Sequence, residues 1–82
     1  MQCKCEVRIE AACPVDEKPD VYEAMFESHD TIRCEDILDA IGKYATEKAY
    51  QEIITADLAR KLRCRVTTIG YHSGVKTTVV AP

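Results

Sequence analysis

Hydrophobic and polar residues alternate in two stretches near the start of the chain. In residues 2–11 the apolar face consists of Cys3, Cys5, Val7, Ile9 and Ala11. A period of two predicts a strand with one buried face, so Cys3 and Cys5 are expected to be small core residues. Residues 21–29 alternate in the same way, with Tyr22, Ala24 and Phe26 on one face. The short connection predicts that the two strands pair antiparallel.

The period changes to that of a helix in the middle of the chain. A helical stripe is formed by Ile37, Leu38, Ile41, Tyr44 and Ala45. This spacing predicts a first helix that is buried along the stripe and contains Gly42. A second helix is expected over residues 50–63, where Ile54, Leu58 and Leu62 follow one side.

Residues 65–71 and 75–80 are rich in Val, Thr and Ile and predict two further strands. The stretch His72-Ser73-Gly74 between them predicts a tight turn. The expected order is therefore β-β-α-α-β-β. Such an α+β chain is expected to form a four-stranded, mostly antiparallel sheet with both helices on one face. Residues 1–82 are expected to form a single domain.

Charge and cysteine content narrow the classes of function. The net charge of −3 argues against an electrostatic nucleic-acid binder. A local basic patch of Arg60, Lys61, Arg63 and Arg65 could contact phosphates, although such residues ordinarily solvate a helix end. No apolar run reaches the ~20 residues of a membrane span, and no signal-peptide pattern is present. An odd count of five cysteines is typical of reduced thiols, so a cytoplasmic protein is expected.

The connection between the first two strands carries the strongest candidate chemistry. Its sequence is Cys13-Pro14-Val15-Asp16-Glu17-Lys18-Pro19-Asp20. The prolines restrict the path, so the thiol of Cys13 and the carboxyl of Asp20 lie at a fixed offset. A thiolate is a nucleophile, and an aspartic acid can donate a proton. The competing interpretation makes Cys13 a core residue and Asp20 an ordinary turn residue.

Further candidates could bind a flat heterocycle. Gln51 and Glu52 open the second helix, and the Glu52 carboxylate could accept two N–H donors from such a ring. The competing interpretation is favourable charge at a helix N-terminus. His72 and Ser73 lie in the second hairpin turn, where most such residues only build the turn. The spacing of the cysteines does not match a metal site, so no metal is expected.

At this point the chain resembles a known family. The element order is that of the tunnelling fold, whose subunits pair sheets edge to edge and bind purine-like or pterin-like rings at their interfaces. The QueF nitrile reductases carry a Cys-Pro-x-Thr-Gly-x-Pro-Asp motif, and residues 13–20 match its cysteine, both prolines and its aspartate while changing Thr-Gly to Asp16-Glu17. The family's His-Glu pair is similar to Gln51-Glu52, and its Arg-Gly-Gly-Ile hairpin is similar to residues 72–75.

The resemblance implies a role for each of these residues. Cys13 would attack the nitrile carbon of 7-cyano-7-deazaguanine to form a thioimide, Asp20 would donate a proton, and Glu52 would hold the ring, with Gln51, His72 and Ser73 nearby. The reductases bind NADPH through a Ser-Lys-Ser-Leu-Lys run, whereas this chain has acidic residues 35, 36 and 39 there, which would repel a phosphate.

The lack of that run favours the QueF-like amidinotransferase branch of archaeosine synthesis. Such an enzyme adds ammonia to the thioimide without a cofactor, acts on a base in tRNA or conceivably DNA, and forms a homo-oligomer. The alternatives are a non-catalytic purine-binding or pterin-binding protein, an NADPH-dependent nitrile reductase relative, and a pterin-pathway enzyme. A zinc cyclohydrolase would need Cys13 and His72 to converge on a metal.

Overall fold

The computed structural model describes residues 1–16 and 18–82. Glu17, one of the two positions that depart from the Thr-Gly of the motif, lies outside the described residues. The strands are β1 (Cys3–Ala11), β2 (Asp20–Ser28), β3 (Arg65–His72) and β4 (Val75–Ala81). The helices are α1 (Cys34–Gly42), a 3-10 helix (Lys43–Ala45) and α2 (Gln51–Leu62). The predicted order of strands and helices is confirmed.

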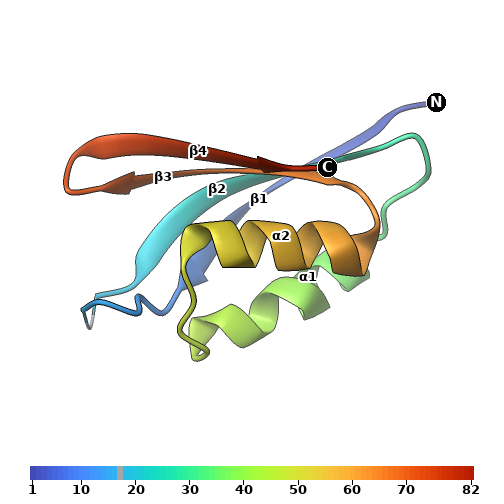
Figure 1. Ribbon diagram of the computed structural model, residues 1–82. Helices are drawn as coiled ribbons and strands as arrows, with labels where there is room; N and C mark the ends of the chain where they lie inside the picture. The colour runs from blue at the N-terminus through green and yellow to red at the C-terminus, as the bar shows by residue number, and fades with distance from the viewer. Residues whose placement is uncertain (17) are drawn as a thin grey trace.

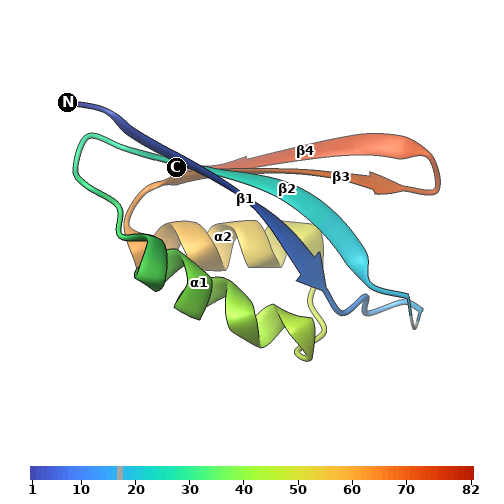
Figure 2. The same ribbon diagram turned by 180° about the vertical axis from the view of Figure 1, so that it is seen from behind.

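The four strands form one twisted sheet in the order β1-β2-β3-β4, and all neighbours are antiparallel. Figure 1 and the reverse view in Figure 2 show α1 and α2 side by side on one face of this sheet. The predicted α+β architecture, with both helices on one face, is therefore confirmed. Within the described residues, no helix has the length and apolarity to cross a membrane.

The core lies between the sheet and the helices and follows the predicted strand parity. Its fully buried large side chains include Ile9, Tyr22, Phe26, Ile54, Leu58 and Val66. Cys5 packs against this core at its edge and is only partly buried. Burial is the main cause of the raised pKa of the Cys5 thiol, with a smaller contribution from Cys3. Cys3 shares the apolar side of β1 but is only partly buried and is not among the residues packed against the core, so the prediction that it is a core residue is wrong.

The first helix departs from its predicted stripe. The α-helix ends at Gly42 and tightens into the 3-10 helix, which changes the direction of the side chains that follow. Ile37, Ala40 and Tyr44 are buried, whereas Leu38 is 59% exposed. The prediction that Leu38 belongs to the buried stripe is wrong, because α1 enters the core through Ile37 and Ala40. It is wrong for Ala45 as well, which lies exposed in the 3-10 helix.

Three connections meet at one end of the molecule. The loop between β1 and β2, the start of α2 and the β3–β4 hairpin all lie at the end of the sheet away from both chain termini (Figures 1 and 2). Segments that are far apart in the sequence are therefore brought together there.

Candidate functional site

A hollow of about 200 Å³ opens where these three connections meet. Its walls are Cys13, Pro14, Val15 and Asp20 from the first hairpin, Tyr22 from β2, Tyr50, Gln51 and Glu52 from α2, and His72 from β3. The structure thus brings together all the residues predicted for the site except Ser73. It also adds Tyr22, which the sequence analysis placed only in the core.

Cys13 lies two residues after the end of β1. Its side chain is partly buried and lines the hollow, so it is neither sealed in the core nor free in solvent. The backbone N–H of Val15 donates to the Cys13 sulfur at 3.5 Å. One residue earlier, the Ala12 N–H donates to the Tyr44 carbonyl oxygen at 2.8 Å. The backbone at the base of the Cys13 loop is therefore tied to the helical layer.

Asp20 begins β2 opposite Ala11, the last residue of β1. The Tyr22 hydroxyl donates to Asp20 Oδ2 at 3.2 Å. The pKa of Tyr22 is raised, first by burial and then by the negative charge and hydrogen bond of Asp20. Weaker contributions from Cys13 and Glu52 indicate that all these groups lie near one phenol.

Gln51 is the most strongly anchored residue of the site. It is only 3% exposed, and its Nε2 lies 3.2 Å from the Thr68 carbonyl, 3.1 Å from the Thr68 hydroxyl and 3.1 Å from the Thr77 carbonyl. Carbonyl oxygens only accept, so the amide nitrogen must face the sheet. The first turn of α2 is thereby fixed to β3 and β4.

The orientation of Gln51 also determines the proton arrangement of His72. Gln51 Oε1 lies 2.8 Å from His72 Nε2. Because an amide oxygen accepts, His72 Nε2 must carry a hydrogen and donate it. In the neutral imidazole, Nδ1 is then the nitrogen left as an acceptor. His72 therefore presents a defined tautomer at the edge of the hollow.

Glu52 stands next to this anchor in the first turn of α2, where its carboxylate is exposed and lines the hollow. Within the described residues, no side chain caps this helix start. Negative charge is favourable there because the free N–H groups of the first turn carry partial positive charge. The placement suits both the binding role and the helix-dipole interpretation.

Ser73 occupies a different place from the other candidates. It and Gly74 form the two-residue turn between the paired residues His72 and Val75. Their φ angles are 52° and 82°, as a primed hairpin turn requires. Ser73 is exposed and does not line the hollow. Its position is accounted for by the turn.

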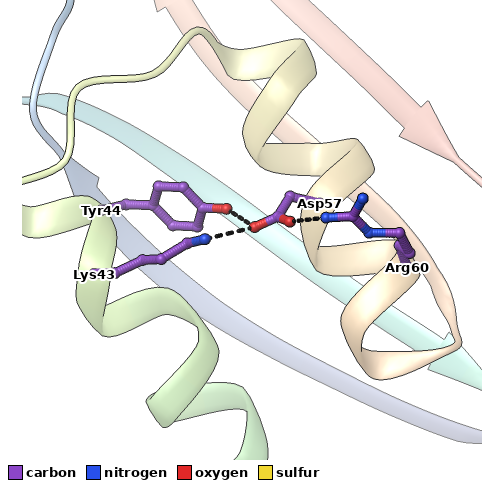
Figure 3. A network of polar contacts seen from close by, with 4 residues as sticks. All are labelled: Lys43, Tyr44, Asp57 and Arg60. Carbon is purple, nitrogen blue, oxygen red and sulfur yellow. Dashed lines mark hydrogen bonds and ion pairs between the residues drawn. The ribbon is translucent and has the colours of Figure 1, made fainter.

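A polar cluster joins the 3-10 helix to α2 (Figure 3). Asp57 of α2 accepts hydrogen bonds from the Tyr44 hydroxyl and from Arg60 Nη2, the latter at 2.6 Å, and Lys43 Nζ lies 3.0 Å away. The hydrogen bond from Tyr44 is the main cause that lowers the pKa of Asp57 to about 2. Burial is the main cause that raises the pKa of Tyr44 to about 12. Through its carbonyl, Tyr44 also holds Ala12, so this cluster connects α2 to the Cys13 loop.

Side chains of the types that bind metal ions line the hollow. In residues 1–16 and 18–82, no three His, Cys, Asp or Glu side chains are grouped so that they could hold one. Cys13 and His72 line the hollow together with Asp20 and Glu52, but among the described residues no three of these side chains are placed so that they could hold an ion together.

Comparison with known proteins identifies the fold. No protein-family model matches the sequence, and no curated protein matches it. The crystal structure of the archaeosine synthase QueF-Like in the apo form is similar, with a TM-score of 0.87 at 23% sequence identity. The match covers 98% of this chain and 90% of that chain. The chain therefore has the tunnelling fold that its sequence resembles, over almost its entire length.

Proposed function

We propose that this chain is a QueF-like enzyme that binds a 7-cyano-7-deazaguanine-type base and converts its nitrile to an amidine. The observation that carries the proposal is the grouping of Cys13, Asp20 and Glu52 around one hollow, from segments far apart in the sequence. A nucleophile, a proton donor and an anchor for ring N–H groups are the parts that such a reaction needs. The similarity in fold to an archaeosine synthase supports the same class of ligand.

The reaction follows from these roles. The Cys13 thiol loses its proton to water and the sulfur adds to the nitrile carbon, so that a carbon–sulfur bond forms and one carbon–nitrogen π bond breaks. The nitrile nitrogen takes the proton of Asp20 to give a thioimide, and Asp20 regains a proton from water. Ammonia then adds to the same carbon, the carbon–sulfur bond breaks, and the amidine leaves while Cys13 regains its thiol. Nothing is oxidised or reduced in this sequence. It therefore needs no hydride donor, and Glu35 and Asp36 in the first turn of α1 are poor partners for a nucleotide phosphate.

The complete site is proposed to need a second copy of the chain. The hollow of about 200 Å³ is smaller than the ~300–1,000 Å³ of typical ligand pockets. Large exposed apolar side chains lie at this site: Val15 and Tyr50 line the hollow, and Val75 is paired with His72 in the second hairpin. A second subunit placed over this rim would bury those side chains and enlarge the walls around the base. Size measurement with and without the base tests this part of the proposal.

Adduct formation provides the direct test. Purified protein is mixed with 7-cyano-7-deazaguanine without ammonia, and the thioimide is followed by its ultraviolet band and by the mass of the intact protein. The wild-type protein should gain one covalently bound base, and Cys13→Ala should gain none. Cys34→Ala is the matched control, because Cys34 is also accessible but lies at the start of α1. An adduct that persists in Cys13→Ala would overturn the assignment.

The second candidate function is reversible binding of a purine-like or pterin-like ring. It is supported by the exposed Glu52 carboxylate and by the small size of the hollow. It predicts that the base binds without a change in protein mass. Cys13→Ala would then leave the affinity largely intact, whereas Glu52→Gln would weaken it.

A further inference from the structure

Tyr22 fits into the wall of the hollow in a way that only a glycine opposite it permits. Its side chain is 1% exposed. A Cβ atom added to Gly70 would lie 2.5 Å from Cδ1 and 2.6 Å from Cε1 of the Tyr22 ring. These distances are far below ordinary van der Waals contact, so the ring rests directly on the backbone of β3. The ring can therefore move little relative to the sheet.

This fixed ring holds a hydroxyl against Asp20. The Tyr22 hydroxyl donates to Asp20 Oδ2 at 3.2 Å, and both residues line the hollow with Cys13. A carboxyl oxygen that accepts this bond is the poorer place for the acidic proton, because a hydroxyl hydrogen already points at it. The proton of Asp20 is therefore directed to Oδ1.

We infer that Tyr22 is a positioning residue, which fixes the Asp20 carboxyl so that Oδ1 is the oxygen that delivers the proton to the nitrile nitrogen. The inference rests on the proposed function for its chemistry, but the Tyr22–Asp20 contact can be tested without any ligand. Tyr22 itself does not react. Once Asp20 has released its proton, the same hydrogen bond stabilises the carboxylate that remains.

The surroundings of Tyr22 keep its hydroxyl a donor. Burial and the charges of Asp20, Cys13 and Glu52 raise the pKa of the phenol, so it stays protonated across the working range. His72 also faces the ring, and its ring centroid lies 6.0 Å from that of Tyr22 at an interplanar angle of 50°.

A purely structural role for Tyr22 makes a different prediction. A core residue needs only its ring, which Tyr22→Phe retains. The positioning role needs the hydroxyl, whose loss removes a bond to a charged group. Such bonds are worth enough to slow the step by about tenfold or more. Loss of the Tyr22 hydroxyl should also move the alkaline side of the pH profile of adduct formation to higher pH, because the Asp20 carboxylate loses its hydrogen-bond donor.

Two experiments separate this inference from the proposed function. The first follows the ionisation of Tyr22 by NMR of protein labelled with ¹³C in its tyrosine rings, in the wild type and in Asp20→Asn. The matched control is Asp16→Asn, because Asp16 lies in the same loop but accepts from the Lys18 N–H at 2.9 Å instead. The second measures the rate of thioimide formation against pH for the wild type, Tyr22→Phe and the exposed-tyrosine control Tyr71→Phe.

The inference is supported if Asp20→Asn lowers the pH at which Tyr22 ionises while Asp16→Asn does not. It is supported further if Tyr22→Phe alone slows the adduct and shifts its pH profile in a protein with unchanged thermal unfolding. If Asp20→Asn leaves Tyr22 ionisation unchanged, or if Tyr22→Phe reacts like the wild type at every pH, the inference is wrong. If the wild type forms no adduct, the proposed chemistry fails, and the NMR titration alone decides whether Tyr22 holds Asp20.

Discussion

Replacing Gln51 by leucine tests whether the amide is the anchor that holds the start of α2 on the sheet. The change keeps a side chain of similar size in a site that is 97% buried but removes every hydrogen bond to Thr68, Thr77 and His72. The buried Thr68 hydroxyl keeps its contact with Thr55 Oγ1 at 2.6 Å. The loss is therefore confined to the bonds of the amide itself.

The size of the effect follows from these contacts. Nε2 has two hydrogens for three acceptors, and Oε1 accepts one further bond, so about three hydrogen bonds are lost. At about 1 kcal/mol each, the free energy of unfolding should fall by about 3 kcal/mol. The accompanying fall in melting temperature is about 15 °C for a domain of this length.

The assay is urea denaturation at fixed protein concentration, followed by circular dichroism. Gln51→Leu is compared with His72→Ala and with the double variant, because the cycle isolates the bond between these two residues. A coupling of about 1 kcal/mol is expected for one neutral hydrogen bond. Glu52→Leu, at the adjacent exposed position, controls for adding a leucine to the first turn and should change stability by less than about 0.5 kcal/mol.

A loss below about 1 kcal/mol for Gln51→Leu would refute this account. It would show that the amide exchanges its sheet contacts for water at little cost and that another contact fixes the start of α2. A coupling near zero with His72 would refute the assigned tautomer, since no hydrogen would then be shared between Nε2 and the amide oxygen.

Three further outcomes are expected. The hydrogen bond from Tyr44 and the neighbouring cations lower the pKa of Asp57 from 3.8 to about 2. The Asp57 carboxylate therefore stabilises the fold fully at pH values above 3.8 and loses this contribution as the pH falls toward 2. In Asp57→Asn, the drop in the free energy of unfolding on acidification, measured with urea, should be smaller. Ser73→Gly should raise stability by about 0.5–1 kcal/mol by relieving a positive φ, and adduct formation should not change; a slower adduct would give Ser73 a role in the site after all. Glu52→Gln should weaken binding of 7-cyano-7-deazaguanine about tenfold or more in calorimetry, whereas the exposed Glu47→Gln should have no effect.

Most of the fold could be predicted because its signals are local. The alternation in residues 2–11 and 21–29 gave the strands and their buried faces, and the hairpin turn at Ser73 and Gly74 gave the last strand pair. The buried face of the first helix was harder to predict. Its predicted stripe ran through Gly42 without a break, but the helix narrows there, and Leu38 is left in solvent.

The site could be predicted only in part, because its most specific features depend on contacts between distant segments. The spacing of residues 13–20 identified Cys13 and Asp20 as candidates, but nothing near Tyr22 shows that its hydroxyl meets Asp20. That geometry depends on Gly70, whose missing side chain makes room for the ring. Gln51 was expected to contact a ligand, yet its amide is turned toward the sheet.

The bond from the Ala12 N–H to the Tyr44 carbonyl has a consequence for how the chain folds. It joins the end of β1 to the 3-10 helix that follows α1, so it closes a loop that contains β2 and α1, and the entropic cost of that closure opposes the contact. Contacts of this kind form late, after local hairpins and helices. The Cys13 loop would then reach its final position near the end of folding, and partly folded chains would expose the Cys13 thiol to solvent.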